Sequence, residues 1–301
     1  MNHVEALTYG IDERETTISR DPQIPINVSA VRHRSPFRYP GGKTWLVPHI
    51  KQWLWSLNAP VERFIEPFAG GAIVGLSALL DRFTYDLTLL EKDINVAAVW
   101  QTIANGDALE LGKRIASFDL TEENVHKLLE KELAPSDILG RAFITIIRNR
   151  IQRGGILAPG ASVMRNGENG RGIKSRWYPE TLEKRLVDLH HLHAHIDFQA
   201  GDGIEYMRSN ANEEGFVWFI DPPYTVAGRR LYLHSQVDHT ELFRVTSDLR
   251  GPFLMTYDDS LQIRELSAKY GFHVRQVAMK NSHHTVMKEL LISSDFDWLH
   301  D

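Results

Sequence analysis

The chain of 301 residues contains no cysteine, and this absence excludes several kinds of chemistry. Disulfide bonds, thiolate metal sites and thiol nucleophiles all require a cysteine side chain. Long apolar runs are lacking as well. No stretch approaches the roughly 18 consecutive apolar residues that indicate a membrane span, and residues 1–20 lack the apolar segment of a signal peptide. We therefore expect a cytoplasmic protein with no membrane partner.

Acidic residues outnumber basic ones, with 39 Asp or Glu against 34 Lys or Arg, so the formal net charge is −5 at pH 7. Domains that bind nucleic acids usually show a basic face, so the overall charge counts against such a partner. The distribution of charge points the other way: ten Lys or Arg residues stand against three Glu residues from Arg141 to Arg185. This window is either a set of solvated helix and loop charges or a nucleic-acid-binding segment.

Metal-ligand spacings are also missing. Histidines gather at His190, His191, His193 and His195, but no cysteine or carboxylate stands beside them at a ligand spacing. Histidines at a helix end and at the start of a strand are the more ordinary interpretation. We predict no metal.

One apolar run leads directly into polar chemistry. Phe216–Ile220 indicates a strand buried on both faces, and Asp221, Pro222, Pro223 and Tyr224 follow without a break. Ligands of open α/β sheets bind beyond the carboxyl ends of such strands, and the prolines stiffen the chain there. Asp221 and the Pro222 carbonyl can accept hydrogen bonds from an amine, and Tyr224 offers a stacking face. The stretch predicts a pocket for a planar aminated ring, and a plain proline-rich turn is the alternative.

Two glycine turns precede this stretch. Gly41-Gly42-Lys43 can bring backbone N–H groups and a cation to an anionic group, although it lacks the spacing of a P-loop. Further on, a strand at Arg63–Phe68, the turn Ala69-Gly70-Gly71 and a helix from Ala72 to Leu80 follow one another. Such a turn lets a ligand approach the backbone closely, so we expect Gly70 to need a positive φ or a close approach to a cofactor. The glycine spacing is not that of dinucleotide-binding folds, which disfavours NAD.

The next strand, Tyr85–Leu90, ends at two acids, Glu91 and Asp93. An acid at this point of an α/β fold commonly holds ribose hydroxyls, and both residues remain candidates for that role. Asp93 is in addition a plausible helix N-cap.

Strands and helices alternate over residues 35–105 and 193–301, which predicts a Rossmann-like, doubly wound, mostly parallel α/β sheet. Residues 106–192 interrupt this alternation with a helical pattern. Residues 1–34 show no sustained periodicity, and we expect them to form a poorly ordered tail.

Taken together, the motifs resemble those of the Dam-type DNA adenine methyltransferases over roughly residues 36–295. The resemblance lies in five stretches: Phe37–Lys43 is similar to F-x-K-W-A-G-G-K, Phe64–Gly71 to E-P-F-x-G-x-G, Asp93–Asn95 to D-I-N, Asn149-Arg150 to the N-R that opens the DNA-contacting segment, and Asp221–Tyr224 to D-P-P-Y. The departures are Arg38 and Tyr39 at the Lys and Trp of the first motif, and Ala72 at the second spaced glycine. Residues 154–177 differ from the members that recognise GATC, so the target sequence is not predicted.

The resemblance implies methyl transfer from S-adenosylmethionine to the N6 of an adenine flipped out of double-stranded DNA. It implies a class I methyltransferase domain with an inserted, mainly helical target-recognition domain at residues 106–192. It assigns catalysis to Asp221, Pro222, Pro223 and Tyr224. It assigns cofactor binding to Tyr39, Gly41, Gly42, Lys43, Glu66, Pro67, Phe68, Ala69, Gly70, Gly71, Asp93 and Asp202, and DNA binding to Asn149, Arg150, Arg153, Arg171, Lys174 and Arg176. A bacterial or phage-encoded protein is implied, and a companion restriction endonuclease or other defence component stays open.

Two rival functions remain. Enzymes that methylate RNA bases or protein glutamine use a related tetrapeptide, but they commonly begin it with Asn and lack a basic insertion. A catalytically silent DNA-binding protein is the second rival. The intact Asp221 and Tyr224 argue against it, whereas the altered turn at Ala72 keeps it open.

Overall fold

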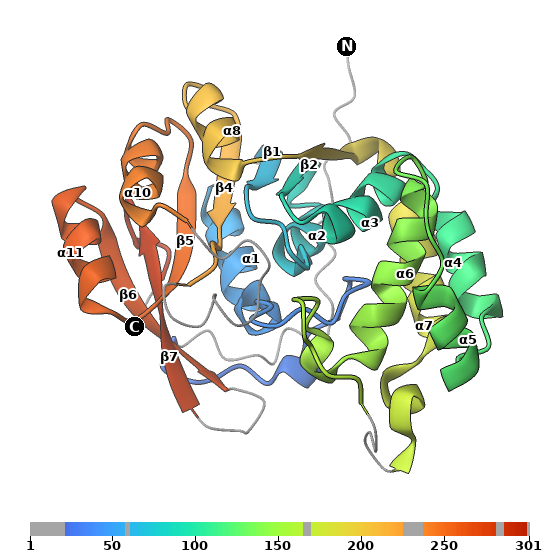
Figure 1. The fold of residues 1–301 in the computed structure, drawn as a ribbon. Coiled ribbons are helices and arrows are strands. Elements are labelled where there is room, and N and C mark those ends of the chain that lie inside the picture. Colours follow the sequence, from blue (N-terminus) through green and yellow to red (C-terminus); the bar gives the residue numbers. More distant parts are fainter. Residues whose placement is uncertain (1–21, 58–60, 165–169, 225–236, 281–285, 300–301) are drawn as a thin grey trace.

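The computed structural model describes residues 22–57, 61–164, 170–224, 237–280 and 286–299. Within these residues seven strands form one sheet, in the order β3-β2-β1-β4-β5-β7-β6 (Figure 1). Strands β1 to β5 are parallel, and β7 runs antiparallel to both β5 and β6. The strand bounds are β1 Val61–Glu66, β2 Thr84–Glu91, β3 Ile196–Ala200, β4 Phe216–Ile220, β5 Phe253–Asp258, β6 His273–Lys280 and β7 Val286–Ser293.

The central strand β4 is buried on both faces because every second side chain enters a different core. Val217 and Phe219 belong to one hydrophobic cluster, whereas Trp218 and Ile220 belong to the other. A continuous apolar run is what a strand in such a position requires. This confirms the expectation drawn from the run itself.

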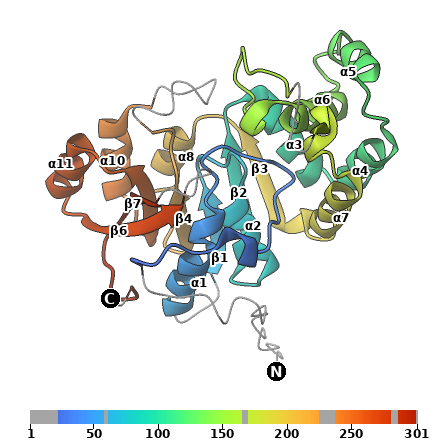
Figure 2. The same ribbon diagram turned by 90° about the horizontal axis from the view of Figure 1, so that it is seen from below.

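Helices cover both faces of the sheet (Figures 1 and 2). One layer holds α1 Val47–Ser56, α2 Ile73–Leu80 and α3 Ile94–Ala104, and the other holds α8 Gly203–Ser209, α10 His239–Ser247 and α11 Leu261–Lys269. The predicted doubly wound α/β sheet is therefore confirmed. The arrangement is a Rossmann-like α/β fold, in which the ligand site lies at the carboxyl ends of the parallel strands.

The segment between α3 and β3 is helical, as predicted. It contains α4 Ala108–Ser117, α5 Glu122–Leu129, α6 Ile138–Ile151 and α7 Pro179–His190, with short 3₁₀ turns at Arg153–Gly155 and Gly172–Arg176. α6 packs against α3, and α4 packs against α7. Their buried side chains join the same hydrophobic cluster as α3. The inserted helices therefore extend the core of the sheet domain and do not form a core of their own.

The prediction of a poorly ordered tail up to residue 34 is wrong for residues 22–34. Ile26 and Val31 are buried in the core, and Arg34 forms a buried ion pair with Asp81. These contacts fix the segment, because a buried charge without its partner is costly. Residues 1–21 lie outside the described residues.

Candidate active site

A cavity of about 630 Å³ opens at the carboxyl ends of the parallel strands. Four strands deliver an acid to it at or just after their last residue: β1 delivers Glu66, β2 Glu91, β4 Asp221 and β5 Asp258. All the cofactor and catalytic residues predicted from the sequence line this cavity. The structure thus brings together residues that lie up to about 185 positions apart in the chain, because parallel strands end at one edge of a sheet.

The turn after β1 is held in place from two sides. Gly70 has a φ of +45°, and a Cβ atom there would lie 2.6 Å from the Tyr39 ring. The Gly70 N–H donates to Glu91 Oε2 at 3.0 Å, and its carbonyl accepts from Trp100 Nε1 at 2.9 Å. The expected positive φ is confirmed, and the close neighbour of Gly70 in this structure is Tyr39.

Ala72 departs from the glycine of the resembling family, yet it keeps the glycine conformation. Its φ is +47° and its ψ is +30°, in the left-handed region, directly before α2. An alanine there costs about 1–2 kcal/mol relative to a right-handed backbone. Ala72 therefore occupies a backbone conformation that glycine would adopt at a smaller cost.

Two buried acids support the turn. Glu66 accepts a hydrogen bond from the Gly75 N–H in α2, and burial, with Asp221 nearby, raises the pKa of this carboxyl to about 8. Glu91 accepts from the backbone N–H groups of Gly70, Lys92 and Asp93, and burial raises the pKa of Glu91 to about 7. Both carboxyls are therefore partly protonated near neutral pH.

The two ribose candidates have different local partners. Both oxygens of Glu91 already accept backbone hydrogen bonds. Asp93 accepts from the Asn95 N–H at 2.8 Å and so caps α3 as predicted. Both residues line the cavity, so either can meet a ligand there.

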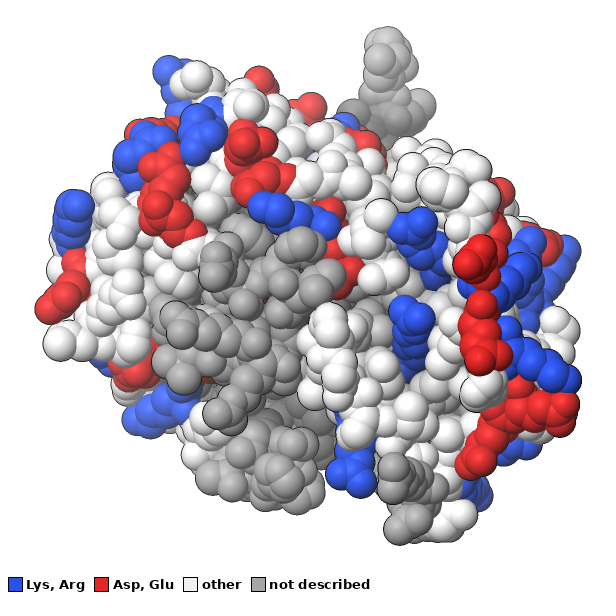
Figure 3. Space-filling view, viewed as in Figure 1, with Lys and Arg blue, Asp and Glu red and all other residues white. Residues whose placement is uncertain are grey.

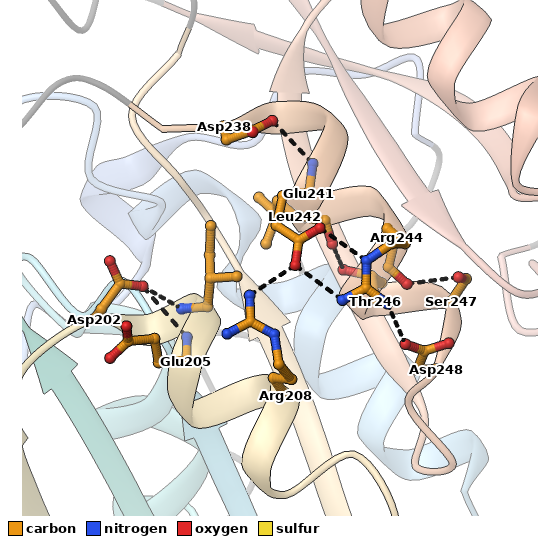
Figure 4. A network of polar contacts seen from close by, with 11 residues as sticks. Asp202, Glu205, Arg208, Asp238, Glu241, Leu242, Arg244, Thr246, Ser247 and Asp248 are labelled. Atoms are coloured by element: carbon orange, nitrogen blue, oxygen red, sulfur yellow. Dashed lines mark hydrogen bonds and ion pairs between the residues drawn. The ribbon is translucent and has the colours of Figure 1, made fainter.

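Asp202 lines the cavity and caps the N-terminus of α8. It accepts from the Ile204 N–H at 2.9 Å and pairs with Lys92 Nζ at 3.1 Å. Burial alone would raise its pKa, but the bonds from Lys92 and from the helix N–H groups outweigh burial and lower it. Figure 4 shows Asp202 at the first turn of α8 and Arg208 farther along the same helix, where it reaches Glu241 on α10 at 2.7 Å. The cavity wall therefore contains the ionised carboxylate of Asp202 on α8, and the Arg208–Glu241 ion pair joins α8 to α10.

Asp221 follows β4 and is already engaged through one oxygen. Its Oδ1 accepts from the Thr256 hydroxyl at 2.6 Å and lies 2.9 Å from Lys43 Nζ. The Lys43 ammonium also donates to the Gly41 carbonyl at 2.8 Å and is 3% exposed. Lys43, predicted to bind the cofactor, thus also pairs with the predicted catalytic acid.

Tyr224 is fixed by its hydroxyl and by its ring. The hydroxyl donates to Glu289 Oε2 at 2.9 Å, and the ring stacks on Tyr257 with centroids 5.9 Å apart. Lys43 Nζ lies 4.9 Å from the ring centroid. Burial, with Glu289 and Asp221 nearby, raises the pKa of Tyr224 well above its ordinary value, so the phenol stays protonated.

Thr256, Tyr257 and Glu289 are functional candidates that sequence reasoning missed. They lie on β5 and β7, far along the chain from the tetrapeptide, and no motif marks them. The signal that was available is Glu289 itself, since a carboxylate at the head of the apolar run Leu290–Ile292 is unusual in a central strand.

The residues predicted to bind DNA divide into two groups. Arg153, Arg171 and Lys174 are exposed and Arg176 is half-buried. Asn149 is 0% exposed and Arg150 is 5% exposed, which argues against the direct DNA contacts predicted for both.

The two buried residues hold the first motif. Asn149 exchanges hydrogen bonds with the backbone N–H and carbonyl of Arg38, each at 2.8 Å, and donates to the Gly155 carbonyl. Arg150 donates to the Pro36 carbonyl. Both side chains therefore position the segment that leads to Lys43.

Metal ligands do not gather anywhere in the described ranges, where no group of three or more His, Asp or Glu residues could hold an ion. Over the same ranges no helix combines the length and apolarity needed to span a bilayer.

A family comparison bears on the first half of this site. Residues 39–126 match the family model described as D12 class N6 adenine-specific DNA methyltransferase. The predicted resemblance is confirmed over these residues. The match contains the Lys43 loop, the Gly70 turn and Asp93, and it ends before Asn149 and Asp221. The match supports methyl transfer, a reaction for which this family description implies S-adenosylmethionine as the methyl donor.

Comparison with other proteins gives similarity at low identity. A putative RNA methyltransferase from Pyrococcus horikoshii is 9% identical over 88% of this chain and 92% of that chain, with a TM-score of 0.42. A putative methyltransferase from Escherichia coli is 12% identical over 86% and 89%, with a TM-score of 0.37. The precorrin-6y C5,15-methyltransferase from Geobacter metallireducens is 10% identical over 81% and 86%, with a TM-score of 0.34. No curated protein matches the chain.

Proposed function

We propose that the protein transfers a methyl group from S-adenosylmethionine to the exocyclic N6 of an adenine flipped out of duplex DNA. The observation that carries this proposal is the set of hydrogen-bond partners of the two Asp221 carboxylate oxygens. Its Oδ1 is taken by Thr256 and Lys43, and within the described residues Oδ2 has no hydrogen-bond partner. That oxygen is available to an amine in the cavity that also contains the glycine turn.

The charge of the cavity suits a cationic cofactor. Ten Asp or Glu residues line it against four Lys or Arg, and these acids are Glu66, Glu91, Asp93, Asp202, Glu205, Asp221, Asp238, Glu241, Asp258 and Glu289. Burial raises the pKa of Glu66, Glu91 and Glu289, but the other seven acids still outnumber the four cations. Walls of this charge repel the phosphates of a dinucleotide and attract a sulfonium. When bound, S-adenosylmethionine supplies an electrophilic methyl group.

The residues predicted for the cofactor fit that group. Gly70 has no Cβ, so the Tyr39 ring can pack directly against the turn, and both residues line the cavity. The loop Tyr39–Lys43 and the turn Glu66–Gly71 would hold the methionine end, as the resemblance implies. Asp93 or Glu91 would meet the ribose, and Asp202 the adenine ring.

Asp221 then acts on the nucleophile. The lone pair of an adenine amine is delocalised into the ring, which makes the nitrogen a poor nucleophile. A hydrogen bond from the amine to Asp221 Oδ2 and another to the Pro222 carbonyl favour a more tetrahedral nitrogen with its lone pair available. Negative charge at Asp221 also stabilises the positive charge that grows on the nitrogen as it accepts the methyl group, until the surplus amine proton passes to solvent. An adenine inside a duplex cannot reach this cavity and must be flipped, with Tyr224 as the stacking platform.

The inserted helices supply the surface for duplex DNA in this proposal. Arg153, Arg171 and Lys174 are exposed there, and guanidinium and ammonium groups are the usual phosphate contacts. On the face shown in Figure 3 Lys and Arg side chains lie along the inner side of the insertion, at the right of the view, and mixed charges lie farther out. A bacterial or phage origin and a companion endonuclease stay predictions.

The test is methyl transfer from labelled S-adenosylmethionine to matched substrates. Duplex DNA, single-stranded DNA, RNA and a protein extract are supplied separately, and the products are digested and identified by mass spectrometry. We expect N6-methyladenine in duplex DNA. Label in RNA bases or in glutamine, with none in DNA, would replace the proposed substrate. Cofactor binding without transfer to any of the four would support the silent DNA-binding protein instead.

A further inference from the structure

The cavity contains a carboxylate to which neither the motifs nor the proposed reaction gives a role. Glu289 lies on the antiparallel strand β7, paired in register with Asp258 of β5, and its side chain is 13% exposed. Its Oε2 accepts the Tyr224 hydroxyl at 2.9 Å and lies 3.8 Å from Lys43 Nζ. One oxygen of Glu289 therefore meets both the predicted stacking platform and the only cation close to Asp221 among the described residues.

The first consequence concerns the net charge of the Asp221, Lys43 and Glu289 side chains taken together. The buried ammonium lies 2.9 Å from Asp221 Oδ1 and 3.8 Å from Glu289 Oε2. One cation between two carboxylates leaves the group with net negative charge when both acids are ionised. Burial raises the pKa of Glu289, and the Lys43 ammonium opposes that rise. Without the charge on Glu289, Lys43 would neutralise Asp221 alone and weaken Asp221 as an acceptor for an amine.

The second consequence concerns the plane of the Tyr224 ring. A tyrosine ring that is free at its hydroxyl end can tilt about its side-chain torsions. Here the hydroxyl is anchored to Glu289, and the ring stacks on Tyr257 with 24° between the planes. A platform fixed in advance loses less conformational freedom when a base stacks on it.

We propose that Glu289 is a positioning residue of the methyl-transfer site, which fixes the plane of Tyr224 and shares Lys43 with Asp221. The inference rests on the proposed function, because it assigns Glu289 to the same reaction. Glu289 acts through Tyr224 and Lys43 and contacts neither the methyl group nor the amine.

The test compares Glu289→Gln, Tyr224→Phe and the double variant of the full chain with the parent protein. Glu289→Gln keeps the size of the side chain and an acceptor for the Tyr224 hydroxyl but removes the charge, and Tyr224→Phe removes the hydroxyl. Single-turnover methylation is measured at saturating cofactor and DNA, beside the Kd for each ligand. We expect Glu289→Gln to lower the single-turnover rate by about tenfold or more while both Kd values change by less than about threefold, since the lost effect acts on the reacting geometry.

The double variant decides whether Glu289 acts through Tyr224. If it does, the combined loss in rate is smaller than the product of the two single losses, because residues in contact are not additive. Glu265→Gln, on the exposed face of α11, is the matched control and should keep the parent rate. Glu289→Asp retains the charge at a shorter reach, and it replaces the Gln variant if that variant does not fold.

The outcomes separate the inference from the function. A parent protein that methylates DNA beside an equally active Glu289→Gln variant overturns the inference alone. Full additivity of the two substitutions overturns the route through Tyr224. A parent protein that transfers no methyl group to any nucleic acid overturns the proposed function and the inference with it.

Discussion

Asp221 has two roles that different substitutions can separate. In the proposed reaction it accepts a hydrogen bond from the amine, and in the structure it pairs with the buried Lys43. Asp221→Ala removes the acceptor for the amine, so we expect single-turnover methylation to fall by about 100-fold or more. The same change leaves Lys43, which is 3% exposed, without its nearest carboxylate, and a buried charge that loses its partner is destabilising. Asp221→Asn keeps an acceptor oxygen for Thr256 and Lys43, and we expect it to be partly active and folded.

The measurement is labelled methyl transfer with saturating cofactor, together with urea unfolding of both variants. An Asp221→Ala variant that binds cofactor and DNA and turns over near the parent rate would remove Asp221 from the site.

Glu66 predicts how the stability of the unliganded protein varies with pH. Burial raises its pKa to about 8 from an ordinary value of 4.5. The native state therefore holds a proton that the unfolded state releases between these values, and the stability this proton confers is lost as the pH rises from about 5 to 8. Glu66→Gln keeps an acceptor for the Gly75 N–H and does not titrate. We expect it to make the decline in unfolding free energy shallower, by up to about 1.4 kcal/mol per pH unit.

Urea unfolding at pH 5.5, 6.5 and 7.5 checks this expectation. Glu62→Gln is the control, because Glu62 is exposed on the same strand and should leave the pH dependence unchanged. Parallel pH curves for the parent and the Glu66→Gln variant would contradict the raised pKa.

At the scale of elements, α6 is the connection between the insertion and the site. Asn149 joins this helix to the backbone of Arg38 and to Gly155 through three hydrogen bonds. Asn149→Ala leaves these buried groups unpaired, and we expect a loss of about 2 kcal/mol or more in unfolding free energy. We also expect weaker activity, because the segment that leads to Lys43 loses its support.

Thermal and urea unfolding measure the loss in stability. Arg153→Ala, at an exposed position just after α6, should stay within about 0.5 kcal/mol of the parent protein. Equal stability of the two variants would return Asn149 to the list of DNA contacts.

The same helix shows where sequence reasoning succeeds and fails. The apolar runs of β1, β2 and β4 are local signals, so their positions were predictable to within a few residues. The Gly70 turn was predictable because only glycine accepts a positive φ at little cost. Asn149 and Arg150 were misjudged because α6 is buried on most of its surface, and a basic sequence window does not say which side chains point inward.

Non-local pairing explains what was missed. Glu289 meets Tyr224 only because β7 inserts antiparallel between β5 and β6, and no local pattern encodes that strand order. The tail was misjudged for the same reason, since the burial of Ile26 and Val31 depends on a surface formed by distant residues.

At the scale of the whole molecule, the proposed function requires an acidic protein to bind a polyanion. The net charge is −5, so binding must come from the local surface of the insertion. Each phosphate neutralised by Lys or Arg contributes about −0.9 to the slope of log K against log salt. Replacing Arg153, Arg171 and Lys174 together by Ala should therefore reduce the slope by about 2 to 3. Titration of labelled duplex DNA between about 50 and 200 mM salt measures this slope.

The matched control removes three exposed cations from the opposite side of the sheet, Arg250, Arg264 and Lys269, and should leave the slope unchanged. Equal slopes in the two triple variants would move the DNA surface away from the insertion, whereas the site on β4 would stand unaltered.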